Sequence, residues 1–278
     1  DACAVTQSTL SAGVLALERQ LDAAILDRSA GKRVVFTALG HEMVTRARDA
    51  LAALMAVTEA AQAARAPMSG RLRLGVIPTL GPFLLPRLMP ALRAAFPNLR
   101  LLLMEDVTDS LVQRLLDSRL DVALLALPCA CAGAETLPVA RDEFLAALPA
   151  DHPLAAHAEV PLAALRADRL LLLEDGHCLR DQALEACGFT RGEQPADGMD
   201  GFAATSLHTL VQMVAGGLVV YLLPRGAVQA GIAEGTGIVL RRLAGAGAWR
   251  TLGLTWRPKA PRAADYRALA PILGQVVA

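Results

Sequence analysis

The sequence predicts an α/β protein whose first third is helical. Residues 71–127 alternate strand-like apolar runs with helical segments in a β-α-β-α-β order, which favours a parallel sheet with right-handed crossovers. A similar alternation returns after about residue 140, whereas the first 65 residues show helical spacing and little strand signal. Two α/β lobes would enclose a cleft, and such sheets bind ligands outside the carboxyl ends of their strands.

The first third predicts two helices around a short hairpin. A polar run over residues 6–11 can cap a helix, which continues with Val14, Leu17 and Leu21 at helical spacing. Residues 30–36 predict a turn and a hairpin that carries two basic side chains. Residues 37–65 predict a long Ala-rich helix with an apolar stripe. The stripe could pack within the chain, but the length of the helix favours a linker between two copies.

Residues 66–70 contain Pro and Gly and mark a domain boundary, which gives domains 1–66 and 71–278. Strands are expected at 71–77, 101–104, 122–127, 144–148, 170–173, 219–223 and 251–256. Helices are expected at 82–96, 110–116, 183–186, 206–215 and 263–277. We expect lobe I to contain about 71–140 plus 248–278, and lobe II about 141–247.

The composition indicates a folded chain in a reducing compartment. Hydrophobic residues make up 54% of the 278 residues, and 27 basic side chains balance 27 acidic ones. The apolar fraction argues against disorder, and zero net charge still permits a local nucleic-acid face. Five cysteines at irregular spacing, without a signal peptide at the start, predict a cytoplasmic protein. The longest apolar run, 213–223, is too short to cross a membrane.

Common catalytic motifs are absent from the sequence. It contains no Gly-x-Ser-x-Gly, no His-Glu-x-x-His and no phosphate-binding loop that ends in Gly-Lys-Ser/Thr. Cys129-Ala-Cys131 is too closely spaced for usual zinc chelation, so we expect a structural or incidental role for it. We therefore expect no enzyme activity, no cofactor and no metal.

Cys178 and Cys187 lie in the run from Glu174 to Cys187. Cys178 is flanked by His177 and followed by Arg180, and such neighbours favour the thiolate. A thiolate with a second thiol nine positions away has the chemistry of a reversible redox sensor. The alternative is that both cysteines are ordinary core residues, since Cys is among the most buried residue types.

The order of these features resembles the LysR-type transcriptional regulators. In that family a winged helix-turn-helix and a long dimerising helix precede a two-lobed, periplasmic-binding-protein-like regulatory domain. Within the family, Gly176-His-Cys-Leu-Arg-Asp-Gln-Ala183 with Cys187 resembles the OxyR-like hydrogen-peroxide sensors. Residues 5–11 and 36–40 match the broad family, and residues 77–86, 205–207, 222–224 and 250–254 match this subgroup. The resemblance covers essentially the whole chain, and it implies that the helix-turn-helix is only partial at the start of this sequence.

The resemblance implies specific roles in a peroxide site. Cys178 would be the cysteine that attacks peroxide, and Cys187 would resolve it as a disulfide. The groups that hold and polarise the peroxide would be Thr79, Thr108, His177, Asp181 and Arg250. The hydroxyls of Thr79 and Thr108 could instead cap strand-to-helix turns, and Arg250 could form a salt bridge.

The resemblance also implies partners. Double-stranded DNA would be contacted by Thr6, Gln7, Ser8, Thr9, Ser11, Lys32 and Arg33. Hydrogen peroxide would be the stimulus, and a thiol reductant such as glutaredoxin or thioredoxin would reverse it. The chain would act as a homodimer or homotetramer.

Three other hypotheses remain open from the sequence. A regulator of the same family could bind a small organic effector in its cleft, in which case neither cysteine would matter for the response. A solute-binding protein shares the two-lobed architecture, although the helical front segment argues against it. A thiol peroxidase would turn over with a reductant, whereas a sensor would show one fast oxidation and slow recycling.

Overall fold

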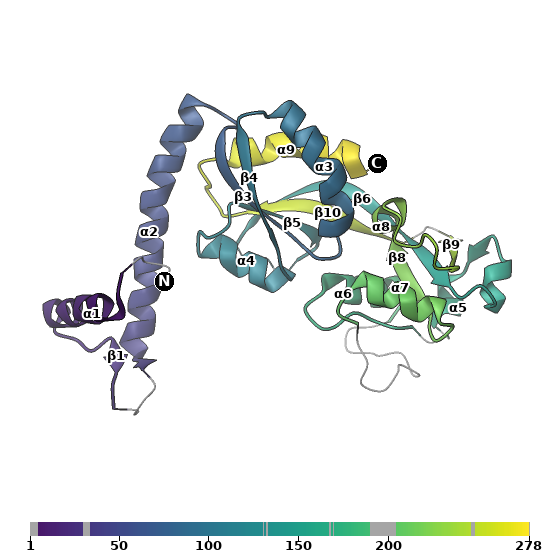
Figure 1. Ribbon diagram of the computed structural model, residues 1–278, viewed down its shortest axis with the longest axis horizontal. Coiled ribbons are helices and arrows are strands. Elements are labelled where there is room, and N and C mark those ends of the chain that lie inside the picture. Colours follow the sequence, from purple (N-terminus) through teal and green to yellow (C-terminus); the bar gives the residue numbers. More distant parts are fainter. Residues whose placement is uncertain are drawn as a thin grey trace. The chain divides into compact units, whose positions relative to one another are not determined.

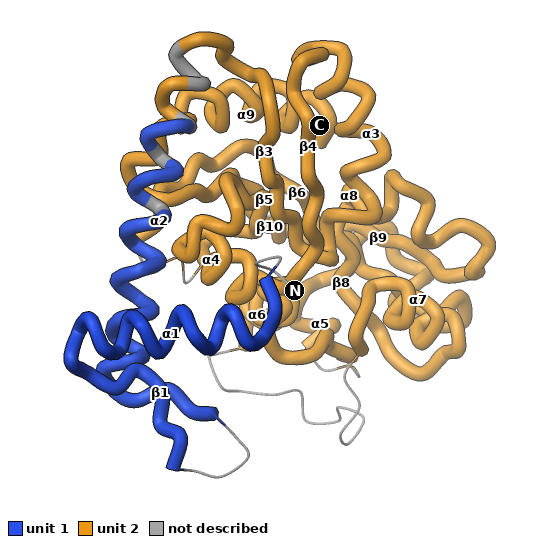
Figure 2. The backbone as a smooth tube through the Cα atoms, turned by 60° about the vertical axis from the view of Figure 1, so that its left-hand side comes forward, with its two compact units in different colours: residues 1–58 blue, residues 59–278 orange. Residues whose placement is uncertain are grey.

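The structure is a computed structural model (Figure 1) that describes residues 5–29, 34–129, 131, 133–166, 168, 170–189, 204–245 and 248–277. Its chain divides into two compact units, residues 1–58 and 59–278 (Figure 2). None of the helices in these described ranges combines the length and the apolarity needed to span a bilayer.

The first unit contains the first predicted helix, most of the second and a short pair of strands; residues 30–33 of the predicted turn lie outside the described residues. Helix α1 (Gln7–Leu21) begins after Thr6, whose side chain accepts a hydrogen bond from the N–H of Thr9 at 3.3 Å. Strands β1 (Leu26–Asp27) and β2 (Val35–Phe36) pair antiparallel. The long helix is α2 (Ala38–Arg65), so the prediction for residues 37–65 is confirmed.

Two local contacts hold α1, β1 and α2 together. The Glu18 carboxylate accepts hydrogen bonds from the backbone N–H groups of Ile25 (2.8 Å) and Leu26 (2.9 Å). It also pairs with Arg28 at 2.9 Å. Gly40 allows α2 to pass close to this loop, because a Cβ at that position would lie 2.1 Å from the carbonyl oxygen of Ile25. The first unit is thus held by the Glu18 side chain and by the close approach of α2 to the loop, rather than by a large core.

The second unit contains strands β3 (Gly70–Val76), β4 (Leu99–Glu105), β5 (Val122–Leu127), β6 (Glu135–Leu148), β7 (Glu159–Val160), β8 (Tyr221–Pro224), β9 (Val239–Leu243) and β10 (Trp249–Trp256). Its helices are α3 (Gly81–Ala95), α4 (Thr108–Leu116), α5 (Leu162–Arg166), α6 (Cys178–Ala186), α7 (Leu207–Ala215), α8 (Arg225–Gln229) and α9 (Ala263–Val277), with a 3-10 turn at Pro153–Ala156. The α/β class is confirmed.

One sheet connects these strands in the order β4-β3-β5-β10-β6-β9-β7, with β8 also paired to β6. The first three strands of the unit are parallel, as predicted: Val76 of β3 pairs with Glu105 of β4 and Leu124 of β5. By contrast, β10 runs antiparallel to both β5 and β6. Strands β6 and β10 extend from the parallel strands toward β8 and β9 (Figure 1).

Two separate hydrophobic clusters form the core of this unit. The first, called here the β3 cluster, gathers buried residues of β3, β5, β10, α3, α4 and α9, such as Leu72, Leu124 and Trp256. The second, the β8 cluster, gathers buried residues of β8, the end of β6, α6 and α7, such as Leu222 and Val211. The two clusters matter for the site because α6 contributes to both.

The structure differs from the predicted elements at short segments. Residues 170–173 form isolated bridges, Leu170 with Val220 and Leu173 with Ala204, rather than a strand. Strands β7 and β9 and helices α5 and α8 were not among the predicted elements. These elements contain two to five residues, which is too short for a periodic apolar pattern to register.

Candidate functional site

The segments that follow the parallel strands meet at one edge of the sheet. Thr79 follows β3, Thr108 follows β4 and begins α4, and Cys129 follows β5. Since β3, β4 and β5 are parallel, their carboxyl ends lie at the same edge, where α/β sheets bind ligands. The hydroxyls of Thr79 and Thr108 are nearly excluded from solvent, with residues 4% and 7% exposed.

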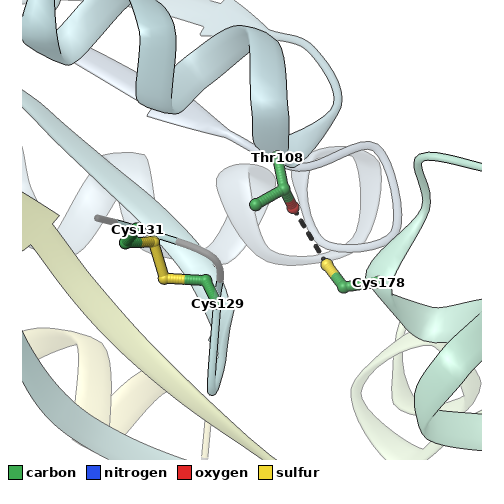
Figure 3. Close-up of a disulfide and its surroundings, with 4 residues drawn as sticks. All are labelled: Thr108, Cys129, Cys131 and Cys178. Carbon is green, nitrogen blue, oxygen red and sulfur yellow. Dashed lines mark hydrogen bonds between the residues drawn. A yellow bond between two sulfur atoms is a disulfide. The ribbon is translucent and has the colours of Figure 1, made fainter.

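Cys178 reaches this edge from another part of the chain. It is the first residue of α6, after the cap residue His177, and its thiol is half-buried. The sulfur lies 3.0 Å from Oγ1 of Thr108 (Figure 3). A helix N-terminus presents unpaired N–H groups and a positive dipole end, both of which stabilise a thiolate. The hydroxyl of Thr108 can donate a further hydrogen bond to the sulfur.

Cys187 lies at the opposite end of the same helix. It is 3% exposed and belongs to the β8 cluster, whereas Cys178 packs against the β3 cluster. Burial raises the pKa of the Cys187 thiol to about 11. Both cysteines are free thiols. Nine helical residues separate their Cα atoms by about 13 Å, beyond the roughly 7 Å that a disulfide allows.

Arg250 is the centre of a buried polar network. Its Nη1 donates to Oγ1 of Thr79 at 2.9 Å, and its Nη2 donates to the Thr79 carbonyl at 3.1 Å. Asp142 of β6 receives Nε at 2.9 Å and Nη2 at 2.8 Å. Asp142 also accepts from the backbone N–H of Gly226 at 2.9 Å. The structure thus joins two predicted site residues, Thr79 and Arg250.

Asp142 was not among the predicted site residues. It stands between Arg141 and Glu143, and three consecutive charges are typical of a solvated surface. The signal that could have indicated it is the alternating burial of β6, in which Asp142 points inward and is 3% exposed. A buried carboxylate needs a cation, and Arg250 supplies it from β10.

An open cavity of about 350 Å³ lies between α6 and the ends of β5 and β10. Gln182, Glu185 and Ala186 line it from α6, and Leu127, Pro128 and Arg250 line it from the sheet. The described contacts thus give two pairs, Thr108 with Cys178 and Thr79 with Arg250. The cavity brings Arg250 beside the helix that begins with Cys178.

The residues next to Cys178 are arranged differently from the sequence expectation. Arg180 donates to the carbonyl oxygen of Leu173 at 2.9 Å and pairs with Asp175 at 3.0 Å, so its charge is directed away from the thiol. Burial lowers the pKa of His177, and the nearby Glu174 charge only partly offsets this, so the imidazole is uncharged near neutral pH. Asp181 is exposed in the first turn of α6.

The residues predicted to contact DNA lie mostly at the start of α1. Thr6 caps the helix, and Gln7, Ser8, Thr9 and Ser11 are exposed on its first turns. Oγ1 of Thr6 lies 2.8 Å from the Ser8 hydroxyl and 2.9 Å from the Thr9 hydroxyl. Lys32 and Arg33 lie outside the described residues.

Comparison with known proteins gives consistent matches over the whole chain. The model of the LysR substrate binding domain matches residues 65–278. The DNA-binding transcriptional dual regulator OxyR of Escherichia coli (strain K12) is 40% identical over 270 residues, which cover 97% of this chain and 87% of the relative. The hydrogen peroxide-inducible genes activator of Haemophilus influenzae is 36% identical over 279 residues, which cover 100% and 90%.

Two solved structures have the same fold over nearly the full length. A full-length OxyR variant from Pseudomonas aeruginosa is 35% identical, with a TM-score of 0.78 over 98% of this chain and 86% of that one. A Corynebacterium glutamicum OxyR variant bound to H2O2 is 31% identical, with a TM-score of 0.73 over 99% and 85%.

Proposed function

We propose, from the premise that this chain belongs to the LysR family and to its OxyR-like branch, that it is a DNA-binding transcriptional regulator that senses hydrogen peroxide. The sensing step is reversible formation of a disulfide between Cys178 and Cys187. One observation carries this proposal: the Cys178 thiol lies at the start of α6 within 3.0 Å of a buried hydroxyl, and a second free thiol ends the same helix.

The chemistry follows from the two positions. The Cys178 thiolate attacks one peroxide oxygen and becomes a sulfenic acid, while the other oxygen leaves as water after it gains a proton. The Thr108 hydroxyl can donate to the sulfur or to a peroxide oxygen, since a hydroxyl is both donor and acceptor. The Cys187 sulfur then displaces the sulfenic oxygen as water and closes the disulfide. The sensor reacts stoichiometrically, which distinguishes it from an enzyme that turns over.

Thr79 and Arg250 are proposed to hold the peroxide with Thr108, His177 and Asp181. Arg250 carries five N–H donors, and its bonds with Thr79 and Asp142 use four of them. The fifth is on Nη1, next to the bond with Thr79. It can stabilise charge that develops on the departing oxygen. A neutral His177 can still accept or donate one hydrogen bond.

The switch is proposed to be the unwinding of α6. The two sulfurs cannot bond while nine residues of helix hold their Cα atoms about 13 Å apart. Cys187 must also leave the β8 cluster, where it is 3% exposed. The covalent bond therefore selects a rearranged segment from Cys178 to Cys187 and repacks the surface around it.

The domain organisation is proposed from the two cores. The β3 cluster and the β8 cluster support lobes of about 71–140 plus 248–278 and about 141–247, as in periplasmic-binding-protein-like regulatory domains. The first 66 residues are proposed to form the winged helix-turn-helix segment and the linker helix. Along α2, Leu51, Leu54 and Val57 expose more than half of their surface, which supports a dimer or tetramer formed through this helix.

The remaining partners are proposed from the same premise. Exposed hydroxyls at the start of α1 suit contacts with double-stranded DNA. A thiol reductant of the glutaredoxin or thioredoxin class would reopen the disulfide, and we propose a cytoplasmic location, where such reductants act.

The test is to add less than one equivalent of peroxide to the reduced protein and map the disulfides by mass spectrometry. We expect a Cys178–Cys187 linkage, which the Cys178→Ser change abolishes. In the Cys187→Ser protein, Cys178 should still form a sulfenic acid, but the protein should no longer activate transcription. If neither change affects the response, the peroxide proposal fails and the cavity beside α6 becomes a candidate site for an organic effector.

A further inference from the structure

The proposed sensing reaction leaves Cys129 and Cys131 unused. They form a disulfide in this structure, with Cα atoms 5.1 Å apart, while Cys178 and Cys187 are free thiols. A bridge between residues two positions apart constrains the unfolded chain less than a bridge across a long loop. The pair therefore contributes little to stability by this route, and a chemical role has to be considered.

The topology brings Cys129 to the edge of the sheet where Cys178 lies. Cys129 follows β5 and Thr108 follows β4, and both strands run parallel to β3 between them. Their carboxyl ends therefore share one edge. The Cys178 sulfur is held at this edge by its contact with Thr108, and Figure 3 shows the Cys129–Cys131 bridge on a neighbouring segment, apart from that contact.

The face of α6 that carries Cys178 also turns toward the chain that leads into Cys129. Cys178 and Gln182 are four residues apart, and Glu185 and Ala186 follow at seven and eight, so all four lie on one face of the helix. Gln182, Glu185 and Ala186 line the cavity of about 350 Å³ whose opposite wall includes Pro128, the residue before Cys129.

We propose that Cys129 and Cys131 are a second redox pair, which competes with Cys187 for the sulfenic acid of Cys178 and returns Cys178 to the thiol. The inference rests on the proposed function, since it requires Cys178 to become a sulfenic acid. The pair enters the reaction as two thiols and leaves it as the disulfide.

The steps balance. Peroxide oxidises the Cys178 thiolate to a sulfenic acid and is reduced to water. The Cys129 sulfur then attacks the Cys178 sulfur, so that a Cys129–Cys178 disulfide forms and the sulfenic oxygen leaves as a second water. The Cys131 thiolate attacks the Cys129 sulfur, forms the Cys129–Cys131 disulfide and releases Cys178 as a thiolate. In sum, one peroxide and two thiols give two waters and one disulfide.

Burial favours this order of events. Cys129 is half-buried and Cys131 is 8% exposed, so Cys129 is the more accessible attacking thiol and Cys131 the resolving one. The competing thiol, Cys187, is 3% exposed and must first leave the β8 cluster. Cys129 and Cys131 are paired in the structure, and both cysteines of α6 are free thiols. A dithiol reductant would then restore the pair.

The experiment uses the full chain with Cys187→Ser, which closes the competing route. The protein is fully reduced, given one equivalent of hydrogen peroxide, quenched at intervals with an alkylating agent and a sulfenic-acid probe, and mapped by mass spectrometry. We expect a transient Cys129–Cys178 linkage, followed by Cys129–Cys131 with Cys178 returned to the thiol. Adding Cys131→Ala should trap the mixed disulfide. The Cys3→Ser change is the matched control and should alter nothing.

Two results would overturn the inference. In the first, the Cys178→Ser protein oxidises its Cys129–Cys131 pair as fast as the parent does. We expect this oxidation to be slower by about tenfold or more, because the reactive thiolate is gone. In the second, the sulfenic acid of Cys178 has the same lifetime in two proteins: the Cys187→Ser protein, and the Cys187→Ser protein that also carries Cys129→Ser and Cys131→Ala. Failure of the proposed function looks different: Cys178 would form no sulfenic acid in any of these proteins.

Discussion

Arg250 and Asp142 form an ion pair that is almost completely buried. Nε and Nη2 of Arg250 lie 2.9 and 2.8 Å from the same carboxylate oxygen, and the two side chains are 1% and 2% exposed. Through Thr79 and Gly226 the pair also fixes the segment after β3 and the start of α8. One charged pair therefore ties β10 and β6 to two loops, and it sets the wall of the cavity beside α6.

Asp142→Ala should destabilise the protein by about 3–5 kcal/mol, because it leaves the guanidinium of Arg250 buried without a counter-charge. The free energy of unfolding, measured by chemical denaturation, checks this. The neighbouring acid on the same strand is the control. Glu143 pairs with Arg225 at 3.2 Å, but the two side chains are 58% and 47% exposed. Glu143→Ala should therefore cost about 0–1 kcal/mol. Similar losses for both changes would show that burial of the pair is not what matters.

Thr108→Val should slow the reaction of Cys178 with peroxide. The change keeps the shape of the side chain but removes the hydroxyl that lies 3.0 Å from the sulfur. A hydrogen bond worth about 1 kcal/mol corresponds to a fall in rate of roughly fivefold. Stopped-flow measurement of sulfenic-acid formation in the Cys187→Ser background gives the rate. Thr108→Ser retains the hydroxyl and should restore most of it; equal rates for Val and Ser would remove Thr108 from the reaction.

Arg180→Ala should speed the closure of the Cys178–Cys187 disulfide relative to the first oxidation. Arg180 anchors the first turn of α6 by its hydrogen bond to the carbonyl oxygen of Leu173. Because a charge-assisted hydrogen bond contributes about 1.5–3 kcal/mol, its removal should lower the free energy needed to unwind the helix by about that amount. The matched control is Asp175→Asn. The Asp175 side chain is 95% exposed, so loss of its ion pair with Arg180 should have little effect. Time-resolved disulfide mapping compares the two proteins, and an unchanged closure rate in Arg180→Ala would contradict the unwinding step.

The parallel part of the sheet could be predicted from the sequence because its strands are buried apolar runs. The expected strand at 122–127 coincides with β5, and those at 71–77 and 101–104 fall within two residues of β3 and β4 at each end. Strand β6 was expected only from 144, although it begins at Glu135. Its first part contains Pro138 and Arg141, which argue against a strand, and it forms because β10 pairs with it over eight residues.

The residues of the site could be named from the sequence, but their contacts could not. Thr108 and Cys178 are 70 positions apart, and no local pattern indicates that the two side chains meet. The same holds for Arg250 and Asp142, which are 108 positions apart. Residues that are close in sequence were not easier to interpret. The spacing of Cys129 and Cys131 argued against zinc chelation, but it did not indicate the disulfide that they form. The experiments above test the roles of Cys178, Cys187 and Thr108, and the roles of the other site residues stay predictions.

Stability at high pH should depend on Cys187. Burial raises the pKa of this thiol from 9.0 to about 11, so the folded protein holds its proton more tightly than the unfolded chain does. The stabilisation by the neutral thiol is thus complete below about pH 9 and is lost as the pH rises through about 11, with a total of about 3 kcal/mol. Denaturation at a series of pH values should show a steeper decline for the parent than for Cys187→Ala. Tyr221 and the other buried groups are common to both proteins, so they do not affect the comparison. An identical slope in Cys187→Ala would mean that the Cys187 thiol is not kept neutral by the β8 cluster.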